Sequence, residues 1–146
     1  MSYDPLDSHE SLRRFIGEFE AGTYPIDKWK HREHVIMASW YLMHLTTHEA
    51  TPTIRAGIQR YNVSQGGQNT ATSGYHETLT ILWIHILAKA LQSATGDVLT
   101  RVRAMASEFG MKAGLYREYY SFDVLKDVEA RYQWMEPDLQ PLPDLL

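Results

Sequence analysis

Residues 79–91, LTILWIHILAKAL, form the longest apolar stretch of the chain and decide the class of fold that it can adopt. Only Thr80, His85 and Lys89 interrupt the stretch. A helix that spans a bilayer needs about 20 predominantly apolar residues, so this stretch is too short to cross one. We therefore predict a helix of a protein core, opening at Gly74-Tyr75-His76 and ending near Ser93.

The segments on either side show the same helical periodicity. In residues 8–20 the apolar side chains of Leu12, Phe15, Ile16 and Phe19 recur at i, i+3, i+4 and i+7, and no long segment alternates with the period of a strand. We therefore predict an all-α fold, a single domain over residues 1–146 with about six helices in an irregular or orthogonal bundle. The expected helices besides 74–93 are 8–20, 31–46, 52–62 with Pro52 at its first position, 97–109, 113–119 and 122–133. Residues 1–7 are expected to be an N-terminal extension, and the proline-rich tail, 136–146, to pack as an extended strap or to hang free.

Composition narrows the classes of function. The chain has 146 residues, a net charge of −4 and 22% charged residues, with acidic and basic side chains interspersed. This distribution gives no basic patch for nucleic acid or for an anionic membrane. The chain has no cysteine, which excludes disulfides, thiolate ligands and a cysteine nucleophile. With no apolar signal region at the N-terminus, a cytoplasmic location is expected by default, and the expected partners are small molecules or proteins.

Two histidine motifs are the strongest chemical signal. His31 and His34 are separated by one helical turn, which places their rings roughly 60° apart around a helix and able to aim at one point. His76 and Glu77 lie in the opening turn of the second helix, beside a glycine-containing loop. Neutral imidazoles and a carboxylate are the usual ligands of zinc, iron and manganese. We therefore predict a mononuclear divalent metal site formed by His31, His34, His76 and Glu77.

The acidic residues beside the histidines have alternative roles. His76 and Glu77 are about 100° apart on a helix, so one of them could orient a ligand instead of binding the metal. Glu33 could do the same beside His34. We therefore take Glu77, His76 and Glu33 as the candidate catalytic residues, including the case of a metal-free acid/base pair. The alternative is structural: histidines exposed in a first turn, and an acid that complements the helix dipole.

Candidate substrate contacts surround the second motif. Residues 63–74 are the longest irregular stretch and hold few side chains able to anchor a core, a feature of mobile or functional loops. Polar and aromatic side chains near this loop and near the first motif suit a cavity for a small organic molecule. The predicted substrate-binding residues are Arg32, Tyr61, Asn62, Asn69, Tyr75 and Trp29. Turn formation is the alternative role for the asparagines.

The motifs also occur in a recognisable order. Residues 29–34 (WKHREH), 75–80 (YHETLT), 119–121 (YYS) and 136–143 (EPDLQPLP) resemble the pattern of a family of small bacterial proteins of unknown function. The resemblance covers most of the chain from about Phe19 onward. It implies an intracellular bacterial protein with one helical domain, and it implies no activity, substrate or cofactor, so function has to be argued from the site.

The sequence supports two main functional hypotheses. The first is a small cytoplasmic metal-dependent enzyme that acts on a small organic molecule, with the divalent ion at a pocket mouth beneath the glycine-containing loop. The second is a metal-free helical module that binds an organic ligand or a partner protein, including a homodimer through an aromatic helix face.

Overall fold

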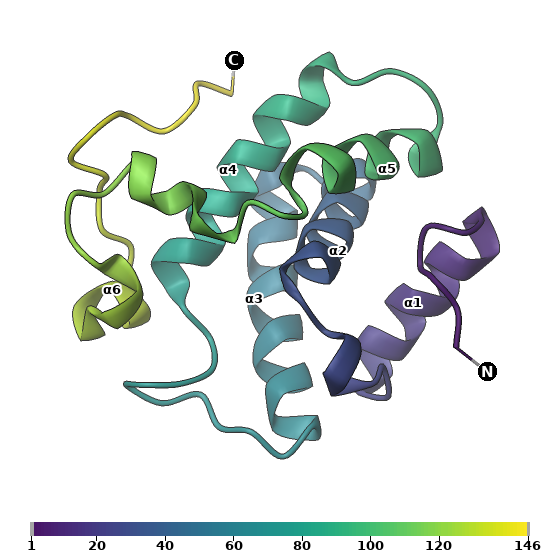
Figure 1. Cartoon of the computed structure of the whole chain (residues 1–146), viewed down its shortest axis with the longest axis horizontal. Coiled ribbons are helices and arrows are strands. Elements are labelled where there is room, and N and C mark those ends of the chain that lie inside the picture. Colours follow the sequence, from purple (N-terminus) through teal and green to yellow (C-terminus); the bar gives the residue numbers. More distant parts are fainter. Residues whose placement is uncertain (1, 146) are drawn as a thin grey trace.

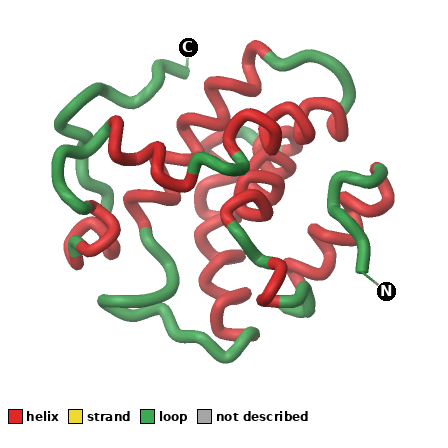
Figure 2. Tube along the Cα trace, viewed as in Figure 1, coloured by secondary structure: helices red, strands yellow, loops and turns green. Residues whose placement is uncertain are grey.

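The computed structural model describes residues 2–145, and within them every regular element is a helix. Six α-helices are present in this range: α1 (His9–Ala21), α2 (His31–His44), α3 (Thr47–Ser64), α4 (Glu77–Ser93), α5 (Val98–Phe109) and α6 (Val128–Tyr132). Three short 3-10 helices join them: η1 (Ile26–Lys28), η2 (Ala113–Glu118) and η3 (Val124–Lys126). Figure 2 shows this composition and the long loop between α3 and α4. The predicted all-α fold with about six helices is confirmed.

Helix α2 lies at the centre of the bundle and packs against α3, α4 and α5. Five consecutive residues of α2, 35–39, are buried, so the helix is enclosed on all sides. A helix that is apolar all round belongs in a core, whereas a helix with one apolar face belongs at the surface. Helix α1 and helix α6 lie at opposite ends of the molecule, with the other helices between them (Figure 1).

Helix α1 shows how local sequence sets the ends of a helix. The hydroxyl of Ser8 accepts a hydrogen bond from the backbone N–H of Ser11 at 3.0 Å, which caps the N-terminus. Gly22 follows the last turn with φ of 76°, a left-handed conformation that favours glycine. The predicted apolar face is the buried one: Leu12, Phe15, Ile16 and Phe19.

An aromatic cluster joins α1 to α2 and α3. The ring of Phe19 stacks on Trp29 with centroids 5.2 Å apart, and Trp29 lies 4.7 Å from the ring of Tyr61. Helix α3 approaches closely at Gly57, where a Cβ atom would come within 2.9 Å of the Phe19 ring. This cluster fixes Trp29 and the start of α2, which carries the first histidine motif.

Helix α3 begins earlier than the sequence indicated. Its first residue is Thr47, so Pro52 lies inside the helix instead of at its first position. Thr46 and Glu49 form a capping box, in which the Thr46 hydroxyl accepts from the Glu49 N–H at 3.1 Å and Glu49 accepts from the Thr46 N–H at 3.1 Å. This box starts the helix five residues upstream of the proline, which removes only one backbone hydrogen bond.

The C-terminal third is less regular than predicted. Residues 113–118 form a 3-10 helix, and the expected helix 122–133 is split into η3 and α6 by Asp127, whose side chain caps α6. Arg131 is only 8% exposed, and its guanidinium donates to the carbonyls of Gly74, Tyr75 and Leu125. It thereby ties α6 to the segment that precedes α4.

The tail packs as a strap. The Tyr119 carbonyl accepts from the Leu139 N–H at 3.0 Å, and the Ser121 backbone N–H and hydroxyl both donate to the Asp138 carboxylate. The Tyr-Tyr-Ser segment and the proline-rich tail, which the sequence pattern groups together, are therefore bound to each other. No helix in residues 2–145 combines the length and apolar character needed to cross a membrane.

Candidate functional site

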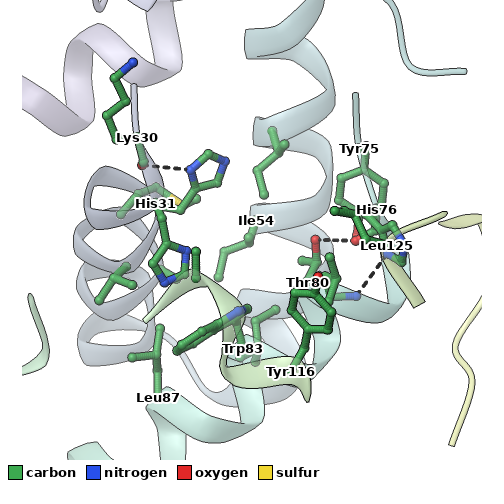
Figure 3. Close-up of a pocket in the computed structure, with 18 of the residues that line it drawn as sticks. Lys30, His31, Ile54, Tyr75, His76, Thr80, Trp83, Leu87, Tyr116 and Leu125 are labelled. Atoms are coloured by element: carbon green, nitrogen blue, oxygen red, sulfur yellow. Dashed lines mark hydrogen bonds between the residues drawn. The ribbon is translucent and has the colours of Figure 1, made fainter. Parts of the chain in front are cut away.

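A cavity of about 640 Å³ lies between α2, α3, α4 and η2. Its walls are mainly apolar and aromatic, and the main groups are the side chains of Trp29, Val35, Ile54, Trp83, Leu87 and Tyr116. Figure 3 shows His31 and Trp83 on one side of the pocket, Tyr75 and His76 on the opposite side, and Ile54 and Tyr116 between them. Concave, mostly apolar spaces with a few polar groups are typical of small-molecule sites.

The first histidine motif lines this cavity. His31 packs against Trp83 with ring centroids 4.7 Å apart, and His34 packs against Trp29 with centroids 4.4 Å apart. Burial lowers the pKa of His31, although the carbonyl of Phe109 opposes the shift. Burial lowers the pKa of His34 to about 4, against the opposing effect of the Lys30 carbonyl. Both imidazoles are therefore neutral at physiological pH.

The tautomer of His34 is fixed by its backbone partner. Its Nδ1 lies 3.1 Å from the Lys30 carbonyl oxygen, the bond marked by the dashed line at Lys30 in Figure 3. A carbonyl oxygen can only accept, so Nδ1 carries the proton, and Nε2 presents a lone pair. Within residues 2–145 this Nε2 makes no hydrogen bond, and unlike Nε2 of His31 it is not sealed by protein atoms. His34, a residue that lines the cavity, therefore keeps one acceptor without a protein partner.

His76 uses both ring nitrogens to hold the fold together. Its Nδ1 accepts from the backbone N–H of Leu79 at 3.2 Å, so His76 is the N-cap of α4. Its Nε2 therefore carries the proton and donates to the Val124 carbonyl at 2.9 Å. Burial lowers the pKa of His76, with the Val124 carbonyl opposing the shift. The residue lines the cavity, but no ring nitrogen is left to bind a metal or to accept a proton.

Glu77 does not line the cavity and binds α3 instead. Its carboxylate accepts two hydrogen bonds from the guanidinium of Arg55, at 2.9 Å and 2.7 Å, and a third from the hydroxyl of Tyr75 at 2.5 Å. Burial alone would raise the pKa of Glu77, but the bonds from Arg55 and Tyr75 outweigh it and lower the pKa below its usual value. The ionised carboxylate is thus committed to an α3–α4 tether.

The acidic candidate of the first motif is also a structural group. Glu33 is buried and accepts from the backbone N–H of Lys30 at 3.1 Å, which caps α2. It also accepts from Arg32 at 3.1 Å, and Arg32 extends on to Asp4 at 3.0 Å. Neither Glu33 nor Arg32 lines the cavity. The predictions of a catalytic Glu33 and a substrate-binding Arg32 therefore lack the required placement.

The other predicted substrate contacts divide into two groups. Trp29, Asn62 and Tyr75 line the cavity. Tyr61 is fully buried and donates its hydroxyl to the Tyr24 carbonyl at 2.6 Å, so it belongs to the core. Asn69 accepts from the side chain of Asn62 at 3.0 Å and from the backbone N–H of Tyr75 at 3.0 Å, so it anchors the loop.

The glycine-containing loop does not cover the cavity. Its side chains bind the end of α3: the Asn69 amide donates to the Gln59 carbonyl, and Gly67 donates to the Asn62 carbonyl. Of the residues 63–74, only Gly74 reaches the cavity. Gly74 has φ of 83°, and a Cβ atom there would meet the Gln68 carbonyl oxygen at 2.5 Å.

The predicted metal ligands do not assemble around one point. His31 and His34 share a wall, His76 lies across the pocket with both nitrogens in use, and Glu77 is paired with Arg55. In the part of the chain that the structure describes, no group of three or more His, Asp or Glu side chains is placed to hold a metal ion. These placements give no support to the zinc, iron or manganese centre, which stays a prediction, and we derive no chemistry through one.

Several cavity residues were missed from the sequence. Trp83 was not among the predicted contacts, and the 3-10 helix η2 contributes Ala113, Gly114, Tyr116 and Arg117. The helical period could have indicated that Trp83 lies on a face of α4, but nothing local marks η2 as a wall. Its position depends on where the chain returns after α5, a tertiary feature that no short motif encodes.

Comparisons of the chain with protein-family models, with curated proteins and with solved structures found no match. Function is therefore argued from the cavity and its chemistry.

Proposed function

We propose that the protein binds a small, largely apolar organic molecule in the cavity between α2, α3, α4 and η2. The observation that carries the proposal is the cavity itself, about 640 Å³ with aromatic walls and a free acceptor, Nε2 of His34. This volume lies within the roughly 300–1,000 Å³ of ordinary ligand pockets.

A role in ligand binding fits the site better than a role in acid/base catalysis. An efficient general base has a pKa near the working pH, whereas burial lowers the pKa of His34 to about 4. The other candidate groups, His76, Glu77 and Glu33, are each held by hydrogen bonds that support the fold. We therefore propose a binding module, the second of the two hypotheses that the sequence supports.

A pair of tryptophan substitutions tests where a ligand binds. Ala113 is exposed and lines the cavity, so Ala113→Trp should fill part of the space without disturbing the core. Ala104, exposed on α5 and away from the cavity, provides the matched control Ala104→Trp. We expect 4-propylphenol and 4-ethylanisole, which have equal numbers of heavy atoms, to bind the wild type with Kd below about 1 mM in calorimetric titrations.

The substitution at the cavity should weaken both probes at least about tenfold, equivalent to about 1.4 kcal/mol, and the control should leave them unchanged. Failure of both probes to bind the wild type, or equal binding by both variants, would contradict the proposal.

The metal hypothesis is tested on the same preparations. Elemental mass spectrometry of protein purified without an affinity tag should show no stoichiometric zinc, iron or manganese. Metal present at one equivalent and lost from both His34→Gln and His76→Ala would establish a shared centre and overturn the binding-only proposal.

A further inference from the structure

The polar groups of the cavity define the chemistry of its ligand, an inference that rests on the function proposed above. One unpaired group among the lining residues is an acceptor, Nε2 of His34, because the Lys30 carbonyl fixes the proton on Nδ1. A ligand atom that meets this nitrogen must therefore be a donor. An acceptor in the same place would set two lone pairs against each other and leave both desolvated.

Charge excludes a cationic donor. Among the described residues that line the cavity there is no Asp or Glu, whereas Lys30 and Arg117 are both present. A buried ammonium group needs a counter-charge, and no carboxylate among the lining residues supplies one.

The two cations are also not placed to bind a carboxylate in the interior. Figure 3 shows the Lys30 amine pointing away from His31 and Trp83, so Lys30 contributes its backbone to this wall. The Arg117 guanidinium is exposed and lies over the ring of Tyr116, 5.0 Å from its centroid. A carboxylate near His34 would meet a neutral lone pair instead of a donor.

The walls favour a flat ring. The aromatic side chains Trp29, Tyr75, Trp83 and Tyr116 line the cavity from the start of α2, the segment before α4, α4 itself and η2. Aromatic faces bind planar apolar groups by stacking or edge contacts. We infer that the ligand is a neutral aromatic alcohol or phenol, whose hydroxyl donates to Nε2 of His34.

The test compares probes of equal size that differ in the hydroxyl. 4-Propylphenol can donate to His34, whereas 4-ethylanisole keeps the oxygen but lacks the O–H. We expect the phenol to bind about tenfold tighter than the anisole, because the anisole leaves the His34 nitrogen unpaired in a desolvated site. A third probe, 4-ethylbenzoate, should bind no tighter than the anisole.

Three variants assign the preference to one nitrogen. His34→Phe removes the acceptor and should bring the phenol-to-anisole ratio close to one, whereas His34→Gln retains an acceptor and should keep part of the ratio. His44, on the same helix, donates its Nδ1 to the Trp40 carbonyl at 2.7 Å in the same way but does not line the cavity. His44→Phe should therefore leave the ratio at the wild-type value.

A spectroscopic readout separates a direct contact from an effect on folding. In ¹⁵N-labelled protein, 4-propylphenol should shift the Nε2 resonance of His34, and 4-ethylanisole should shift it much less. Equal affinities for the phenol and the anisole in the wild type would overturn the hydroxyl assignment while leaving the binding function intact. If the wild type bound 4-ethylbenzoate more tightly than the phenol, the ligand would be an organic anion and the hydroxyl assignment would be overturned. If the wild type bound none of the three probes, the proposed function itself would be overturned.

Discussion

The two histidine motifs occupy equivalent places, each at the N-terminus of a long helix, yet their side chains are used in opposite ways. In the first motif, Nδ1 of His34 donates a hydrogen bond to the Lys30 carbonyl, and Nε2 has no protein partner. In the second motif both ring nitrogens of His76 make hydrogen bonds. Nδ1 accepts from the Leu79 N–H and so caps α4, and Nε2 donates to the Val124 carbonyl. The free nitrogen is what makes the first motif a candidate for ligand recognition.

The position of the histidine within the helix explains the difference. His76 precedes the first turn of α4, where unpaired backbone N–H groups need acceptors, so its Nδ1 is drawn into capping. His34 lies one turn inside α2, where the N–H groups are already paired and a carbonyl four residues back is within reach of Nδ1. A shift of one turn thus changes a capping histidine into one that presents its Nε2 to a cavity.

The largest expected difference between the two motifs is in the free energy of unfolding that is lost when each imidazole ring is removed. His76→Ala deletes the α4 cap and leaves the Val124 carbonyl unpaired, and we expect it to lower the free energy of unfolding by about 3 kcal/mol. His34→Gln should lower it by less than about 1 kcal/mol, because it deletes no cap and retains a polar side chain. Urea denaturation at constant m-value measures both.

Equal losses in the two variants would show that the first motif is as structural as the second. A small loss in His76→Ala would show that the cap and the Val124 bond contribute little.

The second test is the pH dependence of stability. The pKa of His34 is about 4 in the folded protein, below its ordinary value of 6.5, so the unfolded chain binds more protons between these values. The free energy of unfolding therefore falls as pH decreases from 6.5 to 4, by on the order of 2 kcal/mol from His34 alone. Above pH 6.5 this contribution is fully present.

Comparing variants separates His34 from the other groups. The pKa values of His31 and His76 are also lowered by burial, so His34→Gln should flatten the pH dependence without abolishing it. Carboxylates such as Glu77, whose ordinary pKa of 4.5 is lowered in the folded protein, act only at the acid end of the range. Thermal or urea unfolding from pH 7 to 5 measures the histidine contribution. A stability that is flat in this range, or an unchanged slope in His34→Gln, would contradict the buried neutral imidazole.

Sequence periodicity was sufficient to predict which segments are helical. It was insufficient to predict where some of the helices begin and end. The apolar repeat of Leu12, Phe15, Ile16 and Phe19 predicted the buried face of α1, because that repeat is a local property of the chain. The prediction that α3 begins at Pro52 was wrong, because the capping box of Thr46 and Glu49 starts the helix at Thr47. The split of the last helix follows from Asp127, which caps a new helix in the middle of an apparently continuous pattern.

The places of the two histidine motifs in the fold were predictable, and the hydrogen-bond partners of their side chains were not. Local sequence placed both histidine motifs at helix N-termini, where the structure has them. The partners that decide their roles are remote: Val124 lies 48 residues from His76, and Arg55 lies 22 residues from Glu77. A short motif shows the ligand chemistry of a side chain but not which other groups bind it, so the sequence could not show that His76 and Glu77 have other partners.

A third test examines the Arg55–Glu77 tether, which distinguishes the second motif further. Glu77→Gln should lower the free energy of unfolding by about 1 kcal/mol, a modest effect because solvent screens the partly exposed Arg55. Its side chain is 37% exposed, against 15% for Glu77. A double-mutant cycle with Arg55→Met isolates the interaction by urea denaturation. Affinity for 4-propylphenol should stay unchanged in Glu77→Gln, and a tenfold loss would place Glu77 in the site after all.

The last test uses the unmodified protein and determines which ring nitrogen of each histidine carries the proton. The carbonyl partner of His34 requires a proton on Nδ1, whereas the Leu79 N–H requires an unprotonated Nδ1 in His76. The two histidines should therefore be opposite neutral tautomers in the same molecule. Long-range ¹H–¹⁵N correlation spectra at pH 7 assign each tautomer from the ring nitrogens and carbon-bound protons. Finding His34 protonated on Nε2 would put a donor on the cavity wall, reverse the ligand chemistry inferred from it, and remove the difference between the two motifs.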